Sequence, residues 1–514
     1  MNKVYLVGAG PGDPGLITVK GRRVLEQADS VLFDHLANDS LLDLAPAAAE
    51  RVYVGKKKSA HAFTQEEICD MLIERARRGW NVVRLKGGDP FIFGRGGEEA
   101  EALADAGIPF EIVPGVTTPL GIAAYTGVPL THREHTSAVT FVTGHAVDEI
   151  DWDRVGMSET LVIFMGLTTL PQIARELIER GRAADTPAMA VRWATRADQE
   201  TLVGTLATLP GLIESRRMKP PATIVVGEVV RLREKLDWFE RLPLFGRRIV
   251  VTRARSQAEA LSSKLAALGA DVIELPVIEI TSPPMSQESL DRAIADLENY
   301  DWLIFTSANG VKFFVEALDR SASDLRKLRA RICAIGPATS AAIEALHLKV
   351  DLMGKEYVAE GLLAAFAPYD VGGARILLPR AAVARDVIPS ELARRGATVD
   401  VVEAYRTVAP EGLAARAHEV FSAPRKPDWV TFTSSSTVQN LVAAVGVEML
   451  RGVNVASIGP ITSSAARSAG IEVAVEAHEY TIDGLVAALC MSLHLPSRDS
   501  ASTGSLASFA RLVI

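Results

Sequence analysis

The feature that most constrains the fold is a long internal repeat in the second half of the 514-residue chain. The segment 247–275 (RRIVVTRARSQAEALSSKLAALGADVIEL) resembles the segment 374–402 (ARILLPRAAVARDVIPSELARRGATVDVV), which begins 127 residues later. At the same offset, 301–311 (DWLIFTSANGV) resembles 428–438 (DWVTFTSSSTV). A repeat of this length is longer than one supersecondary unit, so it predicts two similar lobes and excludes a solenoid.

Each copy of the repeat has the pattern of alternating strands and helices. A short run of β-branched residues leads into a polar or glycine-containing turn, and apolar residues three and four apart follow. This order is typical of a parallel sheet with helices on both faces, where ligands bind beyond the carboxyl ends of the strands. Hydroxyl side chains at such turns can simply cap helices. Two facing sets of such hydroxyl-rich turns, which also carry Arg253 and Arg380, would instead form a cleft for a polyanion.

The first half begins with a predicted strand that runs into a glycine-rich turn, VYLVGAGPGDPGLITVKG. Gly8 and Gly10 suggest a dinucleotide-binding loop, but the third glycine that should open a helix is missing. Pro11 and Pro14 remove backbone donors that a pyrophosphate would need, and Asp13 adds negative charge. The loop therefore favours a ligand other than a phosphate and argues against a nicotinamide enzyme.

Two further glycine turns follow predicted strands in this half. Gly87-Gly88-Asp89 ends one strand, and Gly115 follows another. The glycines permit close backbone approach, and the Asp89 carboxylate can accept hydrogen bonds from a hydroxyl or an ammonium group. A tight turn without a ligand is the alternative for each turn alone, but three such turns together predict a binding site.

Seven motifs in the first half resemble uroporphyrinogen-III C-methyltransferase: MNKVYLVGAGPGDPGLITVKG, DHLAN, VYVGKK, RLKGGDPFIFGRGGEE, GVPLTHR, LVIFMGL and IVVGEVV. They stand in this order over about residues 2–240. The resemblance implies two α/β lobes with S-adenosyl-L-methionine between them, usually as a homodimer, and S-adenosyl-L-homocysteine as a product. It also implies methylation of uroporphyrinogen III at C2 and C7, giving precorrin-2 through precorrin-1. A methyltransferase of this fold with another substrate is the rival hypothesis.

The resemblance also implies roles for single residues. Asp34 would act as the base and Lys56 as the acid, the alternatives being a turn residue and a solvated lysine. Arg95, His132 and Arg133 would meet substrate carboxylates, unless they form surface ion pairs. The implied cofactor contacts are Pro11, Gly87, Gly88, Asp89, Ile92, Thr117, Thr118, Met165, Ala194 and Gly227.

The second half resembles uroporphyrinogen-III synthase over about residues 247–494, through the repeat and the motifs TSANGV, IGPATS, VEAYRT and TSSSTV. The resemblance implies closure of hydroxymethylbilane with inversion of ring D, and neither a metal nor a cofactor. Two strands would join the lobes, with crossings near Ile280 and Thr407. Tyr405 would assist the loss of water, or would pack between the lobes. The implied substrate-binding residues are Arg253, Ser307, Asn309, Arg380, Thr433, Ser434, Ser435 and Thr462.

The sequence thus predicts an α/β enzyme with two activities in tetrapyrrole biosynthesis, a two-lobed methylase-type domain followed by a duplicated, two-lobed synthase-type domain. The alternative is an active methyltransferase with a non-catalytic tetrapyrrole-binding or regulatory second half. Whether the product leads to sirohaem or to cobalamin stays open. The predicted limits are 1–243 for the methyltransferase, 247–494 for the synthase (247–280 with 408–494 as one lobe, 281–407 as the other) and 496–514 for a disordered tail.

Composition excludes several other classes. The chain has 55 basic and 63 acidic residues, so we expect it to bind neither nucleic acid nor a membrane surface. Cys69, Cys333 and Cys490 are far apart and form neither a disulfide framework nor a zinc motif. The N-terminus leaves no room for a signal peptide, and no apolar run approaches the roughly 18 residues of a membrane span. A cytoplasmic enzyme is expected.

Overall fold

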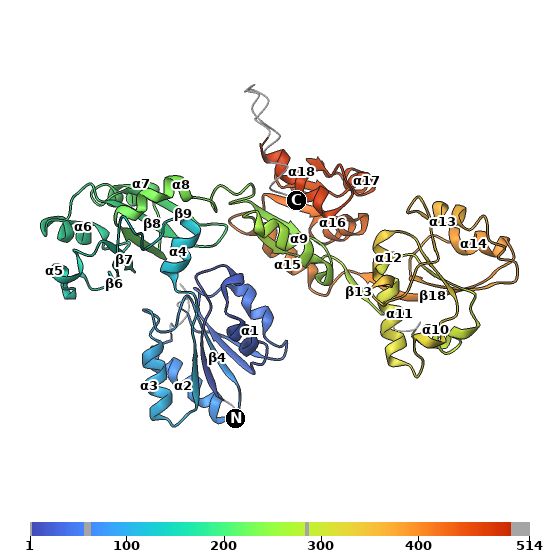
Figure 1. Ribbon diagram of the computed structural model, residues 1–514, viewed down its shortest axis with the longest axis horizontal. Coiled ribbons are helices and arrows are strands. Elements are labelled where there is room, and N and C mark those ends of the chain that lie inside the picture. Colours follow the sequence, from blue (N-terminus) through green and yellow to red (C-terminus); the bar gives the residue numbers. More distant parts are fainter. Residues whose placement is uncertain (1–2, 56–62, 283–286, 495–514) are drawn as a thin grey trace, which may run out of the picture. The chain divides into compact units, whose positions relative to one another are not determined.

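The computed structural model describes residues 3–55, 63–282 and 287–494 (Figure 1). The candidate acid Lys56 and the predicted tail 496–514 lie outside these ranges. The chain forms two compact units. Among the described residues, one contains the chain up to Ile249 together with Ser263–Val272 and Cys490–His494, and the other contains Val250–Ser262 and Ile273–Leu489. The division falls a few residues from the predicted limits at 243 and 247, which we keep as predictions.

The first sheet is parallel and has five strands in the order β3-β2-β4-β1-β5. Buried apolar side chains of helix α1 pack on one of its faces, and those of α2 and α3 pack on the other (Figure 1). The loops after β1, β4 and β5 therefore leave the same edge of the sheet. The elements are β1 Val4–Gly8, η1 Pro14–Leu16, α1 Val19–Leu25, β2 Ser30–Phe33, η2 Asp39–Leu44, β3 Glu50–Tyr53, α2 Gln65–Arg77, β4 Val82–Lys86, α3 Gly96–Asp105 and β5 Phe110–Val113.

The second sheet is mixed, with the order β6-β7-β10-β8-β9. Strands β6 and β7 are parallel, whereas β10 runs antiparallel to both of its neighbours. Buried side chains of β7, β8 and β10 form its core with those of α6 and α7. The elements are α4 Thr118–Thr126, β6 Val139–Thr143, η3 Val147–Glu149, α5 Trp152–Val155, β7 Thr160–Phe164, α6 Leu170–Glu179, β8 Pro187–Arg192, β9 Glu200–Thr205, α7 Leu209–Arg216, β10 Ala222–Val226, η4 Glu228–Leu232 and α8 Arg233–Leu236.

The third sheet contains the outer parts of the repeat, in the order β12-β11-β19-β20-β21. Helices α15, α16 and α17 supply buried side chains to the core beside β11, β19 and β20. The elements are β11 Arg248–Val251, α9 Arg255–Ala267, β12 Asp271–Glu274, α15 Leu413–Ser422, β19 Trp429–Phe432, α16 Ser435–Met449, β20 Asn454–Ser457, α17 Pro460–Ser468, β21 Val475–Glu476 and α18 Ile482–His494.

The fourth sheet contains the inner part of the repeat, in the order β13-β18-β17-β14-β15-β16. Helices α10, α11 and α12 pack on one face, and α13 and α14 on the other (Figure 1). The elements are β13 Glu279–Thr281, α10 Gln287–Ala295, η5 Leu297–Asn299, β14 Trp302–Phe305, α11 Ala308–Arg320, η6 Leu325–Lys327, β15 Arg331–Ala334, α12 Pro337–Glu344, β16 Leu352–Met353, α13 Ala359–Ala365, β17 Arg375–Ala381, α14 Val387–Arg394 and β18 Thr398–Val408.

The third and fourth sheets have the same topology. Strands that correspond in the sequence repeat take the same places, so β12-β11-β19-β20-β21 matches β18-β17-β14-β15-β16. The predicted duplicated α/β fold is therefore confirmed. The fourth sheet has one additional strand, β13, which pairs antiparallel with β18 so that Ile280 lies opposite Thr407.

In the described part of the chain, no helix combines the length and the apolar character needed to cross a membrane.

Candidate functional site

Three glycine turns of the first sheet meet backbone to backbone. Gly88 N donates to Gly10 O at 2.7 Å, and Gly10 N donates to Gly88 O at 3.2 Å. A Cβ atom on Gly115 would lie 2.3 Å from Gly88 O, and one on Gly8 would lie 2.5 Å from Gly115 Cα. Such distances leave no space for any side chain. The loops after β1, β4 and β5 thus form one rigid backbone surface, where the sequence predicts the binding site.

Asp89 connects two of these loops. Its Oδ1 accepts from Phe91 N at 2.8 Å, and its Oδ2 accepts from Gly115 N at 3.0 Å. A carboxylate has about four acceptor positions, so Asp89 can still receive a ligand hydroxyl or amine. Beside it, a Cβ on Gly87 would lie 2.5 Å from Leu36 Cβ, so the loop that carries Asp34 approaches the same turn.

A turn of the second sheet contacts the loop that follows β1. Asp13 N donates to Thr195 Oγ1 at 2.8 Å, and a Cβ on Gly12 would lie 2.8 Å from Ala194 O. A Cβ on Gly121, in α4, would lie 2.5 Å from the Pro11 ring. Two of the implied cofactor contacts, Pro11 and Ala194, are therefore brought together from segments far apart in the sequence.

Backbone strain is concentrated in the same loops. In the described ranges, seven residues other than glycine have positive φ. Such conformations cost about 1–3 kcal/mol each and are found mainly at functional sites. Five of the seven residues with positive φ lie in segments that carry implied site residues: Phe93 (52°), Arg95 (58°), Met165 (52°), Trp193 (49°) and Thr195 (68°).

The Phe93 ring lies 4.8 Å from the Phe164 ring, which is next to Met165 in the sequence. The Met165 side chain is largely exposed.

The other implied cofactor contacts differ in how they are held. Thr117 precedes α4 and is buried, and Thr118 opens that helix with its Oγ1 3.3 Å from the position of a Cβ on Gly88. Ile92 is exposed in the loop after β4. Position 227 requires glycine for a structural reason, because its φ is 152° and a Cβ there would lie 2.6 Å from Glu159 O.

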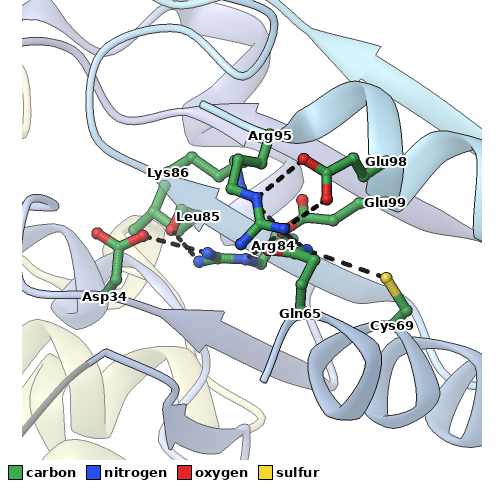
Figure 2. Close-up of polar contacts among 9 residues, drawn as sticks. All are labelled: Asp34, Gln65, Cys69, Arg84, Leu85, Lys86, Arg95, Glu98 and Glu99. Atoms are coloured by element: carbon green, nitrogen blue, oxygen red, sulfur yellow. Dashed lines mark hydrogen bonds and ion pairs between the residues drawn. The ribbon is translucent and has the colours of Figure 1, made fainter. Parts of the chain in front are cut away.

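A buried group of charges lies beside Asp34 (Figure 2). Arg84 and Lys86 point from the same face of β4, and both are buried, as is Glu99 in α3. The Oε1 atom of Glu99 accepts from Lys86 Nζ at 2.8 Å, from Arg84 Nε at 3.1 Å and from Gln65 Nε2 at 3.2 Å. We call Asp34, Arg84, Lys86 and Glu99 the β4 charge cluster. Burial and the nearby charge of Arg84 lower the pKa of Lys86, against the opposing effect of Glu99.

The β4 charge cluster fixes the orientation of Asp34. Arg84 Nη2 donates to Asp34 Oδ2 at 3.1 Å, and Leu36 N donates to Asp34 Oδ1 at 3.0 Å. About a quarter of the Asp34 side chain stays exposed (24%), so a ligand can still reach the carboxylate. These two contacts fix the direction of the carboxylate, and its exposed edge leaves an acceptor position for a ligand proton. The motif RLKGGDPFIFGRGGEE contains Arg84, Lys86 and Glu99, but it gave them no role, because only the fold brings its strand and its helix together beside Asp34.

Arg95 and His132 form local contacts of their own. Arg95 binds Glu98 through two hydrogen bonds of 2.9 and 2.6 Å, and 57% of its side chain is exposed (Figure 2). This is the surface ion pair that we considered as its alternative. Arg133 is exposed.

The rings of His132 and His135 stack with their centroids 4.7 Å apart. With Glu134 they form a group of three possible metal ligands whose ligand atoms lie within 4.8 Å of one another. Lone pairs lie in the ring planes, so stacked rings do not direct them at one ion.

In the second half, the structure brings Tyr405 and Ser307 together. The two hydroxyl oxygens lie 3.0 Å apart, and Ser307 Oγ also accepts from Gly310 N at 3.0 Å, which caps α11. Tyr405 is buried, and its ring stacks on Phe313 at 5.8 Å. The ring contact lies within the core of the fourth sheet, so it does not show the expected packing between the lobes, and the role of Tyr405 in water loss stays a prediction.

Arg253 and Asn309 are linked by a residue that the sequence motifs did not indicate. Arg253 Nη2 donates to Gln257 Oε1 at 3.3 Å, and Gln257 Nε2 donates to Asn309 Oδ1 at 3.2 Å. The Nε atom of Arg253 is buried without a hydrogen-bond partner, and burial lowers the pKa of this guanidinium. Buried donors are nearly always satisfied, so this one indicates a polar ligand. The available signal was the spacing, since Gln257 follows Arg253 by one helical turn.

The remaining hydroxyl candidates lie at the ends of β19 and β20. Ser434 Oγ accepts from Thr437 N at 3.4 Å and so caps α16, next to Thr433. Ser435 Oγ donates to Ile461 O at 3.5 Å, which brings the buried Thr462 into the same region. Arg380 is already engaged, because it donates to Arg385 O at 3.1 Å and pairs with Asp386.

Comparison with known proteins gives a match for each half. Residues 3–210 match the family of Tetrapyrrole (Corrin/Porphyrin) Methylases, and residues 259–487 match Uroporphyrinogen-III synthase HemD. The Porphyrin biosynthesis protein HemD of Ruminiclostridium josui is 36% identical over 490 residues, which are 94% of this chain and 96% of that protein. These matches confirm both resemblances, in the predicted order along the chain.

Other relatives match one half only. The Siroheme synthase of Pseudomonas fluorescens (strain SBW25) is 52% identical over 242 residues, 46% of this chain and 52% of that protein, so the chain spans about half the length of such relatives. The uroporphyrin-III C-methyltransferase of Thermus thermophilus, complexed with S-adenyl homocysteine, is 42% identical over 45% of this chain and 100% of that one (TM-score 0.40). A mutant uroporphyrinogen III synthase of the same species is 19% identical over 48% and 98% (TM-score 0.37).

Proposed function

Since the chain belongs to the family of the porphyrin biosynthesis protein HemD, we propose that it cyclises hydroxymethylbilane to uroporphyrinogen III and then methylates that product. It is an enzyme of tetrapyrrole biosynthesis, with a methyltransferase domain followed by a uroporphyrinogen-III synthase domain. The proposed methylations are at C2 and C7, with S-adenosyl-L-methionine as the donor and precorrin-2 as the product. The expected form is a cytoplasmic homodimer.

The observation that carries the methyltransferase proposal is the convergence of three glycine turns beside the oriented Asp34 carboxylate. The loops after β1, β4 and β5 offer backbone atoms and Asp89 to a nucleoside with an amino-acid tail, and they do not offer a phosphate cradle. The residues that would hold S-adenosylmethionine are Pro11, Gly87, Gly88, Asp89, Ile92, Thr117, Thr118, Met165, Ala194 and Gly227. This cofactor supplies a methyl group activated by positive charge on sulfur.

The residues of this chain would then position the macrocycle and handle its proton. Transfer to a pyrrole carbon forms a carbon–carbon bond, and the positive charge left on the ring is relieved when a proton leaves. Asp34 is the proposed acceptor, because Arg84 and the Leu36 amide hold its carboxylate with one edge exposed.

For the cyclisation, the enzyme must hold hydroxymethylbilane, a flexible substrate with many carboxylates, and must assist the loss of water from it. The unpartnered Nε of Arg253, together with Gln257 and Asn309, is the proposed grip on a substrate carboxylate. The Tyr405 hydroxyl, 3.0 Å from Ser307 Oγ, is the proposed donor to the departing oxygen. The alternative is a non-catalytic second half that only binds tetrapyrroles, in which the Tyr405 ring would serve only to pack against Phe313.

The test is incubation of the full chain with hydroxymethylbilane and S-adenosylmethionine, followed by mass and isomer analysis. We expect a dimethylated type III product. In Asp34→Ala, methylation should fall by about 10²- to 10⁴-fold, the usual contribution of a general base, while cyclisation stays unchanged. Loss of both activities would indicate a folding defect and not a role as base. Formation of only the spontaneous type I isomer would support the binding-module alternative.

A further inference from the structure

The segment that joins the two halves lies against residues next to the proposed cofactor site. This connecting segment, 233–245, begins with α8 and runs to the start of the second half. It carries none of the proposed catalytic or cofactor-binding residues. Two independent lines of contacts nevertheless lead from it to Asp13, in the loop that follows β1.

The first line consists of hydrogen bonds. Glu240 Oε1 accepts from Gln199 Nε2 at 2.8 Å, and Gln199 Oε1 accepts from Thr195 N at 2.9 Å. Thr195 Oγ1 in turn accepts from Asp13 N at 2.8 Å. Gln199 is 5% exposed and Thr195 is 3% exposed, so water does not readily replace these bonds. Because Thr195 has a φ of 68°, its turn needs such support from its surroundings.

The second line is aromatic. The Tyr125 hydroxyl donates to Asp13 Oδ2, and the Tyr125 ring packs against Phe239 at 4.7 Å and against Trp238 at 5.5 Å. Phe239 is buried, and Trp238 Nε1 donates to Ala124 O at 2.7 Å. Burial and the Asp13 carboxylate raise the pKa of Tyr125, so its hydroxyl remains a donor throughout the neutral range.

The connecting segment is itself fixed against the end of α4. Arg233 Nη1 donates to Thr126 O at 2.8 Å, and Arg233 also pairs with Glu240. A Cβ on Gly127 would lie 2.2 Å from Leu236 O, so the two backbones are in direct contact. The segment is thus a firmly packed part of the first half.

We propose that the connecting segment positions the Pro11–Asp13 loop for the cofactor, with Glu240 and Gln199 as positioning residues. This inference rests on the proposed methyltransferase function, because it takes the Pro11–Asp13 loop as part of the cofactor site. Neither residue touches the loop directly, and both act through Thr195. A change in the connecting segment should therefore alter the affinity for the cofactor.

The test measures binding of S-adenosylhomocysteine to the full chain by calorimetry. Gln199→Met keeps the side-chain volume but removes both hydrogen bonds, and Glu240→Ala removes the acceptor. We expect each to raise the Kd about tenfold, because each breaks the path of hydrogen bonds from Glu240 to the Thr195 turn. Glu240→Gln keeps an acceptor oxygen and should stay within about threefold of the unaltered chain. Glu234→Ala, at an exposed acid of the same segment, is the matched control and should change nothing.

Kinetics separate positioning from stability. In Gln199→Met, the KM for S-adenosylmethionine should rise while the kcat for methylation and the cyclisation rate stay unchanged, and the unfolding midpoint without ligand should fall because two buried hydrogen bonds are lost. A lower unfolding midpoint with an unchanged Kd would assign these contacts to stability alone and overturn the inference. If all four variants bound S-adenosylhomocysteine as tightly as the unaltered chain, the inference would also be overturned, but the proposed function would stand. If the unaltered chain did not bind S-adenosylhomocysteine, the proposed function itself would fail.

Discussion

The two halves of the chain hold their candidate residues by different physical means. In the first half, backbone contacts and buried charges do so: a Cβ on Gly115 would lie 2.3 Å from Gly88 O, and Glu99 is buried among three donors. In the second half, Ser307 and Ser434 cap helices. Serine, threonine, aspartate and asparagine can all cap a helix, whereas only glycine fits the first kind of contact. Residue identity is therefore more strictly determined in the first half.

The largest expected difference concerns buried and exposed charges. Glu99→Ala leaves Arg84 and Lys86 buried without their shared acceptor, which should cost about 3–5 kcal/mol of unfolding free energy. The matched change in the second half is Arg375→Ala, which removes pairs with Asp296 and Asp400. The Arg375 side chain is 39% exposed. Its loss should cost less than about 1 kcal/mol. Urea unfolding, resolved into separate transitions for the two units, measures both, and equal losses would contradict the comparison.

The next difference concerns space at the strand ends. Gly115→Ala places a methyl group 2.3 Å from a carbonyl oxygen, whereas the Cβ of Gly336→Ala would meet Tyr357 Cβ at 3.1 Å. Overpacking of this kind costs about 1–3 kcal/mol, so the first change should lower the unfolding midpoint and abolish binding of S-adenosylhomocysteine. The backbone at Gly336 is extended, so Gly336→Ala should change the unfolding midpoint little. Thermal unfolding and calorimetry compare them, and a stable Gly115→Ala chain with normal binding would break the contrast.

The fold was largely predictable, because it follows from repeated local patterns. The offset of 127 residues between the copies predicted two lobes, and the third and fourth sheets have matching strand orders. The three glycine turns meet at one edge of the first sheet, as expected, since parallel strands present their carboxyl ends together. The antiparallel β10 in the second sheet left no comparable signal in the periodicity.

Contacts between distant elements could not be predicted. The β4 charge cluster joins residues from the loop after β2, from β4 and from α3, and only the folded sheet brings them together. The chain of bonds from Glu240 to Asp13 crosses 227 positions of sequence. The pair of Arg95 with Glu98, by contrast, has helical spacing and could have been read from the sequence.

A smaller effect tests the role of Tyr405. Tyr405→Phe keeps the ring that stacks on Phe313 but removes the hydroxyl that lies 3.0 Å from Ser307 Oγ. If the hydroxyl assists water loss without being strictly required, cyclisation should slow about tenfold, which corresponds to about 1.4 kcal/mol. Methylation of added uroporphyrinogen III should not change. An unaltered cyclisation rate would assign Tyr405 to packing and would leave the second half without a proposed catalytic residue.

The smallest expected effect is a dependence of stability on acid in both halves. Hydrogen bonds from Arg75 at 2.6 and 2.9 Å lower the pKa of Glu50, and those from Arg394 and Arg395 lower the pKa of Glu391 to about 2. A carboxyl whose pKa is lower in the folded state stabilises the fold above its unfolded pKa of about 4.3. That stability is lost as the pH falls through the folded value.

Glu50→Gln should therefore destabilise the first unit at pH 7 by about 1 kcal/mol or less, because the Glu50 side chain is 38% exposed. The difference from the unaltered chain should shrink as the pH falls below about 4.3, where the Glu50 carboxyl of the unfolded chain begins to take up a proton, and should vanish as the pH passes the lowered pKa of the folded state. Glu391→Gln should show the same sign in the second unit, with the difference persisting closer to pH 2. Urea unfolding at a series of pH values measures both. A difference that grows on acidification would reverse the assigned sign, because it would mean that the protonated carboxyl is the form that the fold stabilises.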